Sequence, residues 1–277
     1  MKHAQYSWST SDGIEVFAQS WSPDGKAKAV VALVHGLGEH SGRYPLLVEK
    51  LPAAGYAING YDLRGHGKTG GPRLYASSFD VLADDVGKHI EQTRQRFPGL
   101  PMFLYGHSMG GEQVLYYVLR HSPSLAGVVA TSPLLAPGTP TSSGRAAVAR
   151  FLARLVPKNI IPTQIPWDSL SRDQAVIDWT KKDPLCQEGV SLRLGMEVVR
   201  AGEWISRQSK FPLPLLVLQG TGDQHVSPQK TIAFAKQLTG DVTLKIFEDG
   251  RHELHNDLDR EKVATLVLDW MGKHLAA

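Results

Sequence analysis

Residues Met102–Gly111 of the sequence read MFLYGHSMGG. An apolar run, Met102–Tyr105, leads into a serine flanked by glycines two positions away on each side, and a helix-like segment, Gly111–Arg120, follows. Strand, tight turn and helix in this order present a nucleophilic serine at the end of a sheet strand. The glycines are needed because side chains there would collide with the adjacent strand and helix. We therefore expect Ser108 to lie at a helix N-terminus, where backbone N–H groups favour developing negative charge.

Short apolar runs recur on both sides of this stretch, separated by loops and helix-like segments. They are Ala29–Val34, Ala57–Tyr61, Gly127–Ala130, Leu215–Leu218 and Thr243–Phe247. Such runs are typical of parallel strands that helices bury on both faces. A strand-and-turn pattern around residues 14–19 indicates an antiparallel hairpin at the edge. The sequence thus predicts an α/β fold with a mostly parallel central sheet flanked by helices.

The alternation stops between Pro137 and Arg207, where the sequence is helical, arginine-rich and interrupted by prolines. We interpret this stretch as a helical insertion within a single domain that spans residues 1–277. One apolar helix face in it is formed at helical spacing by Val148, Phe151, Leu152 and Leu155. Two interpretations of this face remain open. The helix packs on the core, or its apolar rim contacts lipid.

Composition excludes several classes of protein. The 277 residues include 30 Lys plus Arg and 27 Asp plus Glu, a net charge of +3 without long runs of one sign, so we expect no nucleic-acid partner. The single cysteine, Cys186, excludes an intramolecular disulfide and a Cys-rich zinc site. Met1–Thr10 has no apolar signal segment, and no window approaches eighteen apolar residues. We expect a cytoplasmic protein, able to lie peripherally against a membrane without spanning it.

A nucleophilic serine needs a base to remove its proton and a carboxylate to orient that base. Asp223 follows the strand-like run Leu215–Leu218, and His252 follows Thr243–Phe247, at the strand ends where catalytic groups of open α/β sheets collect. The chain order Ser108, Asp223, His252 is the order in which these three groups occur when the serine lies on such a strand–turn–helix motif. We predict these three as the catalytic residues, with no metal or redox cofactor required.

The oxyanion of an acyl-transfer intermediate needs two N–H donors. The residue after the nucleophile, Met109, supplies one by the usual geometry. The loop His35–Gly38, just after the strand-like run Ala29–Val34, is suited to supply the second, and we predict the N–H of Leu37. The alternative for this glycine-rich loop is a plain tight turn.

Two motifs resemble cofactor or metal sites without meeting their requirements. Gly65–Gly70 satisfies G-x-G-x-x-G, but Asp62 stands where the phosphate-binding loop needs a glycine, and the following Gly-Pro pair breaks any helix. His252–His255 spaces its two histidines three apart and lacks the H-E-x-x-H pattern of zinc proteases. We expect neither a nucleotide nor a metal.

Several longer motifs are more specific than the serine motif alone. They are His35–Tyr44 (HGLGEHSGRY), Asp62–Gly67 (DLRGHG), Gly106–Gly111 (GHSMGG), Ser132–Pro133, Asp183–Leu185 (DPL) and His252–His255 (HELH). With them the sequence resembles the monoacylglycerol lipase branch of the α/β-hydrolases nearly end to end. The resemblance implies an α/β-hydrolase fold in which residues 137–207 form a cap over the acyl-binding pocket.

The same resemblance implies a small polar pocket for the glycerol head, bordered by Glu39, Arg43 and His255. The alternative for Glu39 and Arg43 is a structural ion pair that anchors their loop. Glu112 departs from the family pattern, in which a small residue commonly follows the Gly-Gly pair.

The expected activity is therefore serine-dependent hydrolysis of lipid esters, with monoacylglycerol cleaved to glycerol and fatty acid through an acyl-enzyme. A lysophospholipase or a broad short-chain carboxylesterase would use the same three residues. From other classes, the alternatives are a non-catalytic ligand-binding α/β-hydrolase and an acyltransferase. The expected partners are the lipid ester and, transiently, a membrane or micelle surface that the cap contacts.

Overall fold

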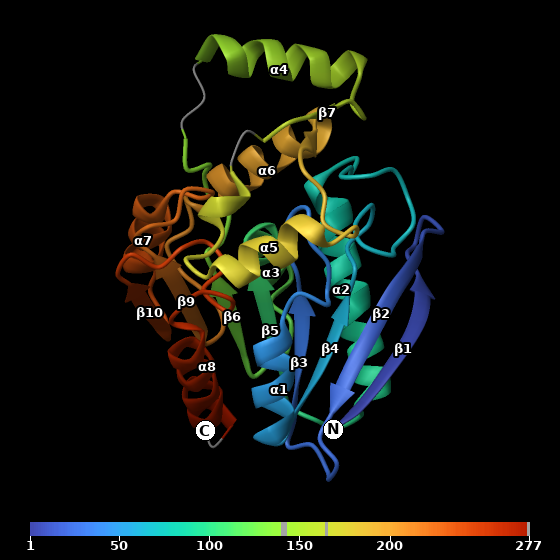
Figure 1. Ribbon diagram of the computed structural model, residues 1–277, viewed down its shortest axis with the longest axis vertical. Helices are drawn as coiled ribbons and strands as arrows, with labels where there is room; N and C mark the ends of the chain where they lie inside the picture. The colour runs from blue at the N-terminus through green and yellow to red at the C-terminus, as the bar shows by residue number, and fades with distance from the viewer. Residues whose placement is uncertain (140–142, 164–165, 276–277) are drawn as a thin grey trace.

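The computed structural model describes residues 1–139, 143–163 and 166–275 (Figure 1). Its strands are β1 (Lys2–Ser9), β2 (Glu15–Ser22), β3 (Ala29–Val34), β4 (Tyr56–Tyr61), β5 (Met102–His107), β6 (Gly127–Thr131), β7 (Ile160–Ile161), β8 (Val190–Ser191), β9 (Leu215–Gly220) and β10 (Val242–Phe247). Its helices are α1 (Pro45–Ala53), α2 (Phe79–Arg96), α3 (Met109–His121), α4 (Ser143–Leu155), the 3₁₀ turn η1 (Trp167–Ser169), α5 (Gln174–Lys182), α6 (Leu192–Ile205), α7 (Pro228–Gln237) and α8 (Arg260–Leu275).

The central sheet has eight strands in the described chain, in the order β1-β2-β4-β3-β5-β6-β9-β10. β1 pairs antiparallel with β2 and β2 antiparallel with β4, whereas the pairs from β4 to β10 are parallel. The predicted α/β class, with its mostly parallel sheet and an antiparallel hairpin at one edge, is confirmed. The prediction located the hairpin only around β2, because β1 is an edge strand with mostly exposed or half-buried side chains.

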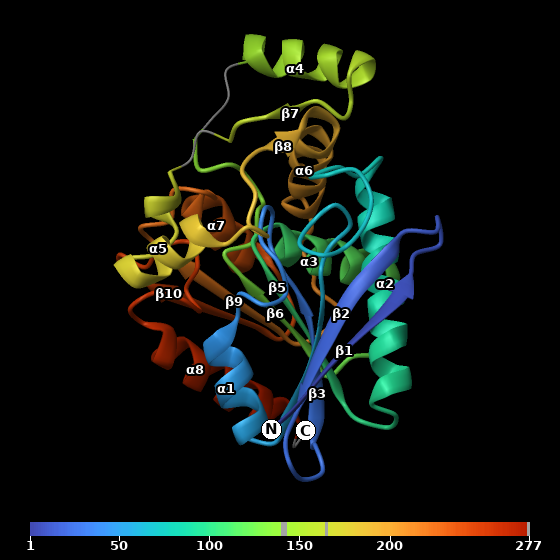
Figure 2. The same ribbon diagram turned by 45° about the vertical axis from the view of Figure 1, so that its right-hand side comes forward.

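Helices cover both faces of the sheet, which explains why every residue of β3 is buried. α1 and α8 pack on one face through Leu47, Leu51, Val263 and Val267. α2, α3 and α7 pack on the other through Phe79, Val86, Val114 and Phe234. Figure 2 shows α1 and α8 together on one side of the strands and α2 on the other. The sheet's carboxyl edge is left free of these helices, and open α/β sheets place their sites there.

Residues between β6 and β9 add no strand to the central sheet. They form α4, η1, α5 and α6, together with the two-residue strands β7 and β8, which pair antiparallel with each other. No strand was expected in this insertion, and β7 and β8 are the exceptions. Residues 140–142 and 164–165 of the insertion lie outside the described residues.

Helix α4 packs on α6 at the outer end of this segment (Figure 1). Ala153 is buried, but Val148, Phe151 and Leu155 are 59%, 61% and 63% exposed, and Leu152 is 38% exposed. The interpretation that this apolar face packs on the core is therefore wrong. The small side chain of Ala153, rather than the large ones, provides the buried contact.

None of the helices in the described ranges combines the length and the apolar character needed to cross a lipid bilayer.

Candidate active site

Ser108 lies at the turn between β5 and α3, as the N-cap residue of α3, with a φ of +53°. This conformation is unfavourable for a residue with a side chain, so the surrounding packing has to hold it. A Cβ on Gly106 would overlap the carbonyl oxygen of Gly110, and a Cβ on Gly110 would overlap those of Val34 and His35. The two glycines thus permit the close approach of strand and helix that presents the Ser108 hydroxyl.

The three residues predicted as catalytic lie together after the ends of β5, β9 and β10. His252 Nε2 is 2.9 Å from Ser108 Oγ, and His252 Nδ1 is 2.8 Å from Asp223 Oδ2. All three side chains are at least nine-tenths buried. The hydroxyl of Ser132 donates to the carbonyl oxygen of His252 at 2.9 Å and holds its backbone. The arrangement lets the imidazole accept the serine proton while the carboxylate holds the ring.

The charges of the pair suit that role. Burial alone would lower the pKa of His252, but the adjacent Asp223 carboxylate outweighs it and raises that pKa above its ordinary value. Burial would raise the pKa of Asp223, yet His252 and the backbone N–H of Val226 stabilise the carboxylate and hold its pKa below the usual range. Asp223 Oδ1 accepts from the N–H groups of His225 at 2.8 Å and Val226 at 3.1 Å. Asp223 therefore stays ionised and favours the imidazolium.

The loop after β3 lies against the nucleophile. A Cβ on Gly36 would lie 3.0 Å from Ser108 Cβ, so only glycine allows this approach. Within the described part of the chain, the N–H groups of Leu37 and Met109 donate to no protein acceptor. Two N–H groups without an internal acceptor, on the residue after the serine and on a loop beside it, are what an oxyanion requires.

A cavity of about 680 Å³ opens onto Ser108 and His252. Gly36–Glu39 of the loop after β3 and Arg43 line one part of it, and the segment between β6 and β9 lines much of the rest. Its apolar lining includes Leu134, Ile161, Val190, Val198, Val199 and Val226. Its volume and mostly apolar lining match a site for a small lipid-sized ligand.

One end of this cavity carries a buried charge network. Arg43 Nη2 is 3.0 Å and 2.8 Å from the two carboxylate oxygens of Glu253. Glu39 Oε1 accepts from Tyr44 Oη at 2.8 Å and from the Gly36 N–H, while Glu39 Oε2 is 3.8 Å from Arg43 Nε. Burial, followed by repulsion from Glu253, raises the pKa of Glu39 to about 7. One guanidinium thus faces two carboxylates and bonds only one of them closely.

The sequence matches the Hydrolase_4 family model, described as serine aminopeptidase S33, over residues 25–259. The chain belongs to this α/β-hydrolase family. Human monoglyceride lipase is 34% identical over 252 residues, which cover 90% of this chain and 83% of that protein. An uncharacterised abhydrolase domain-containing protein of Dictyostelium discoideum is 33% identical over 96% of this chain, but this chain spans only 28% of its length.

The fold agrees with that membership. The crystal structure of Paleococcus ferrophilus monoacylglycerol lipase superposes with a TM-score of 0.85 and 31% identity, over 94% of this chain and 99% of that one. The resemblance to the monoacylglycerol lipase branch of the α/β-hydrolases, and the fold it implies, are confirmed. The protein is a serine hydrolase of this lipase and esterase family.

Of the three residues expected to border a glycerol pocket, the structure places two at the cavity. Glu39 and Arg43 line the cavity, whereas His255 is not among the lining residues. The His255 ring is buried between Tyr44, stacked at a centroid distance of 4.4 Å, and His107, in edge contact at 4.7 Å. Burial lowers the pKa of His255 to about 4. In this α/β-hydrolase His255 therefore lies behind His107, which itself lines the cavity.

Glu253 is a lining residue that the sequence analysis missed. It directly follows His252 and joins the cavity wall through its pair with Arg43. Asn256 Nδ2 also donates to Glu253 Oε2, at 2.8 Å. An acidic residue beside the predicted base was the available signal, but its partner lies 210 residues away, and the local sequence does not reveal that contact.

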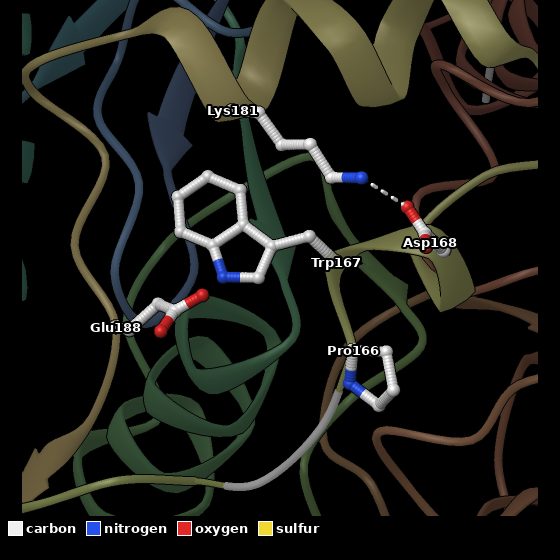
Figure 3. A pocket seen from close by; sticks show the side chains of 5 residues that line it. All are labelled: Pro166, Trp167, Asp168, Lys181 and Glu188. Carbon is white, nitrogen blue, oxygen red and sulfur yellow. Dashed lines mark hydrogen bonds and ion pairs between the residues drawn. The ribbon is translucent and has the colours of Figure 1, made fainter.

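A second, smaller hollow of about 340 Å³ lies beside η1 and α5 (Figure 3). Figure 3 shows the Trp167 ring between the side chain of Glu188 and the Lys181–Asp168 ion pair, in which Nζ lies 2.6 Å from Oδ1. Trp167 and Glu188 also line the main cavity, so the indole borders both spaces.

The ligating atoms of His40, Asp183 and Cys186 lie within 4.8 Å of one another, close enough to be considered for a metal. His40 Nδ1 accepts the Gly42 N–H at 3.2 Å, so His40 Nε2 carries the ring proton and donates it to Asp183 Oδ2 at 2.9 Å. Both ring nitrogens of His40 therefore have hydrogen-bond partners within the protein. The hydrogen bond from His40 to Asp183 joins the loop after β3 to the segment between β6 and β9, as does the bond from Gln187 N to Gly38 O at 2.7 Å.

Proposed function

We propose that this protein hydrolyses monoacylglycerols to glycerol and free fatty acid through an acyl-enzyme on Ser108. The observation that carries the proposal is the hydrogen-bonded series Ser108–His252–Asp223 at the mouth of one cavity with apolar walls and a polar end. The apolar walls suit an acyl chain, and the polar end suits the diol head of glycerol.

The reaction follows from the positions of these groups. Ser108 Oγ attacks the ester carbonyl carbon as His252 Nε2 takes the hydroxyl proton, and the oxyanion accepts hydrogen bonds from the N–H groups of Leu37 and Met109. The C–O bond to glycerol then breaks, and His252 returns the proton to the departing alkoxide. A water molecule, deprotonated by His252, attacks the acyl-enzyme, releasing the fatty acid and restoring Ser108.

The polar end supports a glycerol head because its hydrogen-bonding capacity is incomplete. Among the described residues, Glu39 Oε2 and the Nε and Nη1 atoms of Arg43 have no hydrogen-bond partner although they are buried. Such atoms cost free energy unless a ligand or water satisfies them. The hydroxyls of glycerol, which both donate and accept, can bond to the free carboxylate oxygen and to the guanidinium.

We assign residues 137–207 to a cap within the single domain of residues 1–277, and α4 to its membrane-contacting edge. The exposed side chains of Val148, Phe151 and Leu155 lie on the same helix as the exposed Arg150 and Arg154. From residue 113 to residue 167 the sequence contains no acidic residue. An apolar edge with basic neighbours and no negative charge suits the surface of a bilayer that contains anionic lipids.

A substrate panel tests the proposed function. The purified protein is assayed on monoacylglycerol, diacylglycerol, lysophosphatidylcholine and a p-nitrophenyl ester of the same acyl chain, and monoacylglycerol is expected to give the highest kcat/KM among the lipids. Faster turnover of lysophosphatidylcholine would make the protein a lysophospholipase. Hydrolysis of the p-nitrophenyl ester alone would indicate a general carboxylesterase, and transfer of the acyl group to an added alcohol instead of water an acyltransferase.

The variant Glu39→Gln tests the head-group assignment within that panel. Glutamine keeps an oxygen for the Gly36 N–H and removes the charge that faces Arg43. We expect monoacylglycerol hydrolysis to fall about tenfold, the value of roughly one charge-assisted hydrogen bond, with a smaller loss on the p-nitrophenyl ester. An equal loss on both substrates would show that Glu39 only anchors the loop.

A further inference from the structure

His225 lies two residues after Asp223, and its backbone holds that carboxylate. The N–H of His225 donates to Asp223 Oδ1 at 2.8 Å. The loop itself is fixed by backbone bonds, because the N–H of Gly138 donates to His225 O at 3.0 Å and the N–H of Ser227 donates to Ala136 O at 3.0 Å. These bonds do not involve the imidazole of His225, so that ring is free to serve another purpose.

The ring of His225 stacks on the ring of His252. The ring centroids are 4.6 Å apart and the planes differ by 16°. His107 also contacts the His252 ring, in a tilted arrangement with the ring centroids 4.8 Å apart. His225 also lines the cavity with His252. The base is thus held in its plane by an aromatic neighbour, in addition to its bonds to Ser108 and Asp223.

The far side of the His225 ring is tied to the cap. Ser169 of η1 donates its hydroxyl proton to Pro166 O at 2.6 Å, so its oxygen accepts from His225 Nε2 at 2.9 Å. This bond requires the tautomer with a proton on Nε2. Burial, followed by repulsion from His252, lowers the pKa of His225 to about 3, so the ring is neutral when His252 takes up the serine proton. A neutral aromatic face is a favourable neighbour for an imidazolium, and a second cation is not.

We propose that His225 is a positioning residue for the reaction: its ring fixes the plane of the His252 imidazole, and Ser169 of the cap fixes the ring of His225. The assignment rests on the proposed function, in which His252 is the general base. The cap thereby acts on the catalytic base through one hydrogen bond and one stacked ring. His225 itself touches neither the reacting atoms nor the transferred proton.

Three variants separate this role from simple packing. His225→Ala removes the stack and the tether, His225→Phe restores an aromatic face without the tether, and Ser169→Ala removes the tether alone. Gln224→Ala, an exposed neighbour in the same loop, is the matched control. Each protein is assayed well below its Tm for kcat and KM on a dissolved short-chain p-nitrophenyl ester, and for its rate of inactivation by a fluorophosphonate.

For His225→Ala we expect kcat and the inactivation rate to fall about 10- to 100-fold, because the His252 base is misplaced. KM should stay within about twofold of the wild-type value, because substrate binding is unchanged. His225→Phe should recover most of the loss, and Ser169→Ala should lose a few-fold. Combining Ser169→Ala with His225→Ala should add nothing to His225→Ala alone, since the tether acts only through the ring.

Other results would overturn the assignment. A His225→Ala variant with kcat within twofold of the wild type, or one that loses only thermal stability, would show that the ring merely fills space. A loss in KM alone would make His225 a substrate contact. If the wild type itself hydrolyses no ester, the proposed function fails instead, and the two failures are distinguished by that assay.

Discussion

Arg43 and Glu253 are 210 residues apart in the sequence and face each other in the cavity wall, where one guanidinium nitrogen bonds both carboxylate oxygens at 3.0 Å and 2.8 Å. Both side chains are almost fully buried. The pair joins the loop after β3 to the residue that follows His252. It therefore fixes the loop after β3 and His252 relative to each other, and removing one partner would leave the other charge buried.

Removing the carboxylate should cost stability. We expect Glu253→Ala to lower the free energy of unfolding by about 3–5 kcal/mol, because Arg43 is left buried without its close partner. Urea unfolding followed by circular dichroism measures this. The control is Glu261→Ala, which breaks an exposed pair with Lys50 and should cost less than about 1 kcal/mol. Similar losses for both variants would contradict the importance given to the buried pair.

Glu112 should make stability depend on pH. Its side chain is fully buried on α3 and burial raises its pKa well above the ordinary value, although the Gly202 backbone partly opposes this. The folded protein then holds a proton that the unfolded chain releases, so stability is full below the unfolded pKa and falls as pH rises toward the folded pKa. Each pH unit in that window removes up to about 1.4 kcal/mol.

Glu112→Gln removes the titrating group and keeps its size. We expect the variant to gain stability over the wild type as pH rises above the ordinary pKa of a glutamate, because only the wild type has a carboxyl whose pKa burial raises. Unfolding curves at several pH values measure it, and the comparison of the two proteins cancels the other titrating groups. Parallel curves for both proteins would mean that Glu112 does not titrate in this way.

The sequence predicts the buried strands of the sheet well and its exposed edge poorly. The runs at β3, β5, β6 and β9 are apolar because helices bury both faces of those strands, so they were predicted nearly to the residue. Edge strand β1 was not, because only Tyr6 and Trp8 give it an inward face of large apolar residues. Local pattern is sufficient where burial is complete, and weak at an exposed edge.

The sequence likewise indicates some residues of the site and not others. Chain order and strand-end position indicated Ser108, Asp223 and His252, and the structure brings them within hydrogen-bond distance. The contacts of Glu253, His225 and His255 are tertiary, and their neighbours in sequence do not reveal them. The same holds for the apolar face of α4, since periodicity shows that a face exists but not what covers it.

Asp223→Asn tests the electrostatic support of the base. The Asp223 carboxylate is what raises the pKa of His252 against burial. We expect kcat on a short-chain ester to fall about 10³- to 10⁴-fold, and the acid limb of the residual kcat/KM profile to move to lower pH, because His252 loses its proton more easily. An unchanged acid limb would show that a group other than His252 sets the pH dependence.

Phe151 and Leu152 test the contact of α4 with membranes. Replacing both by serine should lower hydrolysis of monoacylglycerol in vesicles containing phosphatidylglycerol by about tenfold or more, with little change on a dissolved short-chain ester. Ile246→Ser, at an exposed apolar residue of β10, is the control for general surface polarity. Unchanged vesicle activity would remove the interfacial role, and an equal loss on pure phosphatidylcholine vesicles would remove the preference for anionic lipid.

A comparison of the wild type with Ser108→Ala on monoacylglycerol, following both products and labelling by a fluorophosphonate, tests most directly whether the protein is a monoacylglycerol hydrolase that uses Ser108. We expect equal amounts of glycerol and fatty acid from the wild type, with the label on Ser108. In the variant, the label should be absent and turnover should fall at least about 10³-fold. Undiminished release of fatty acid by folded Ser108→Ala would show that Ser108 is not the nucleophile.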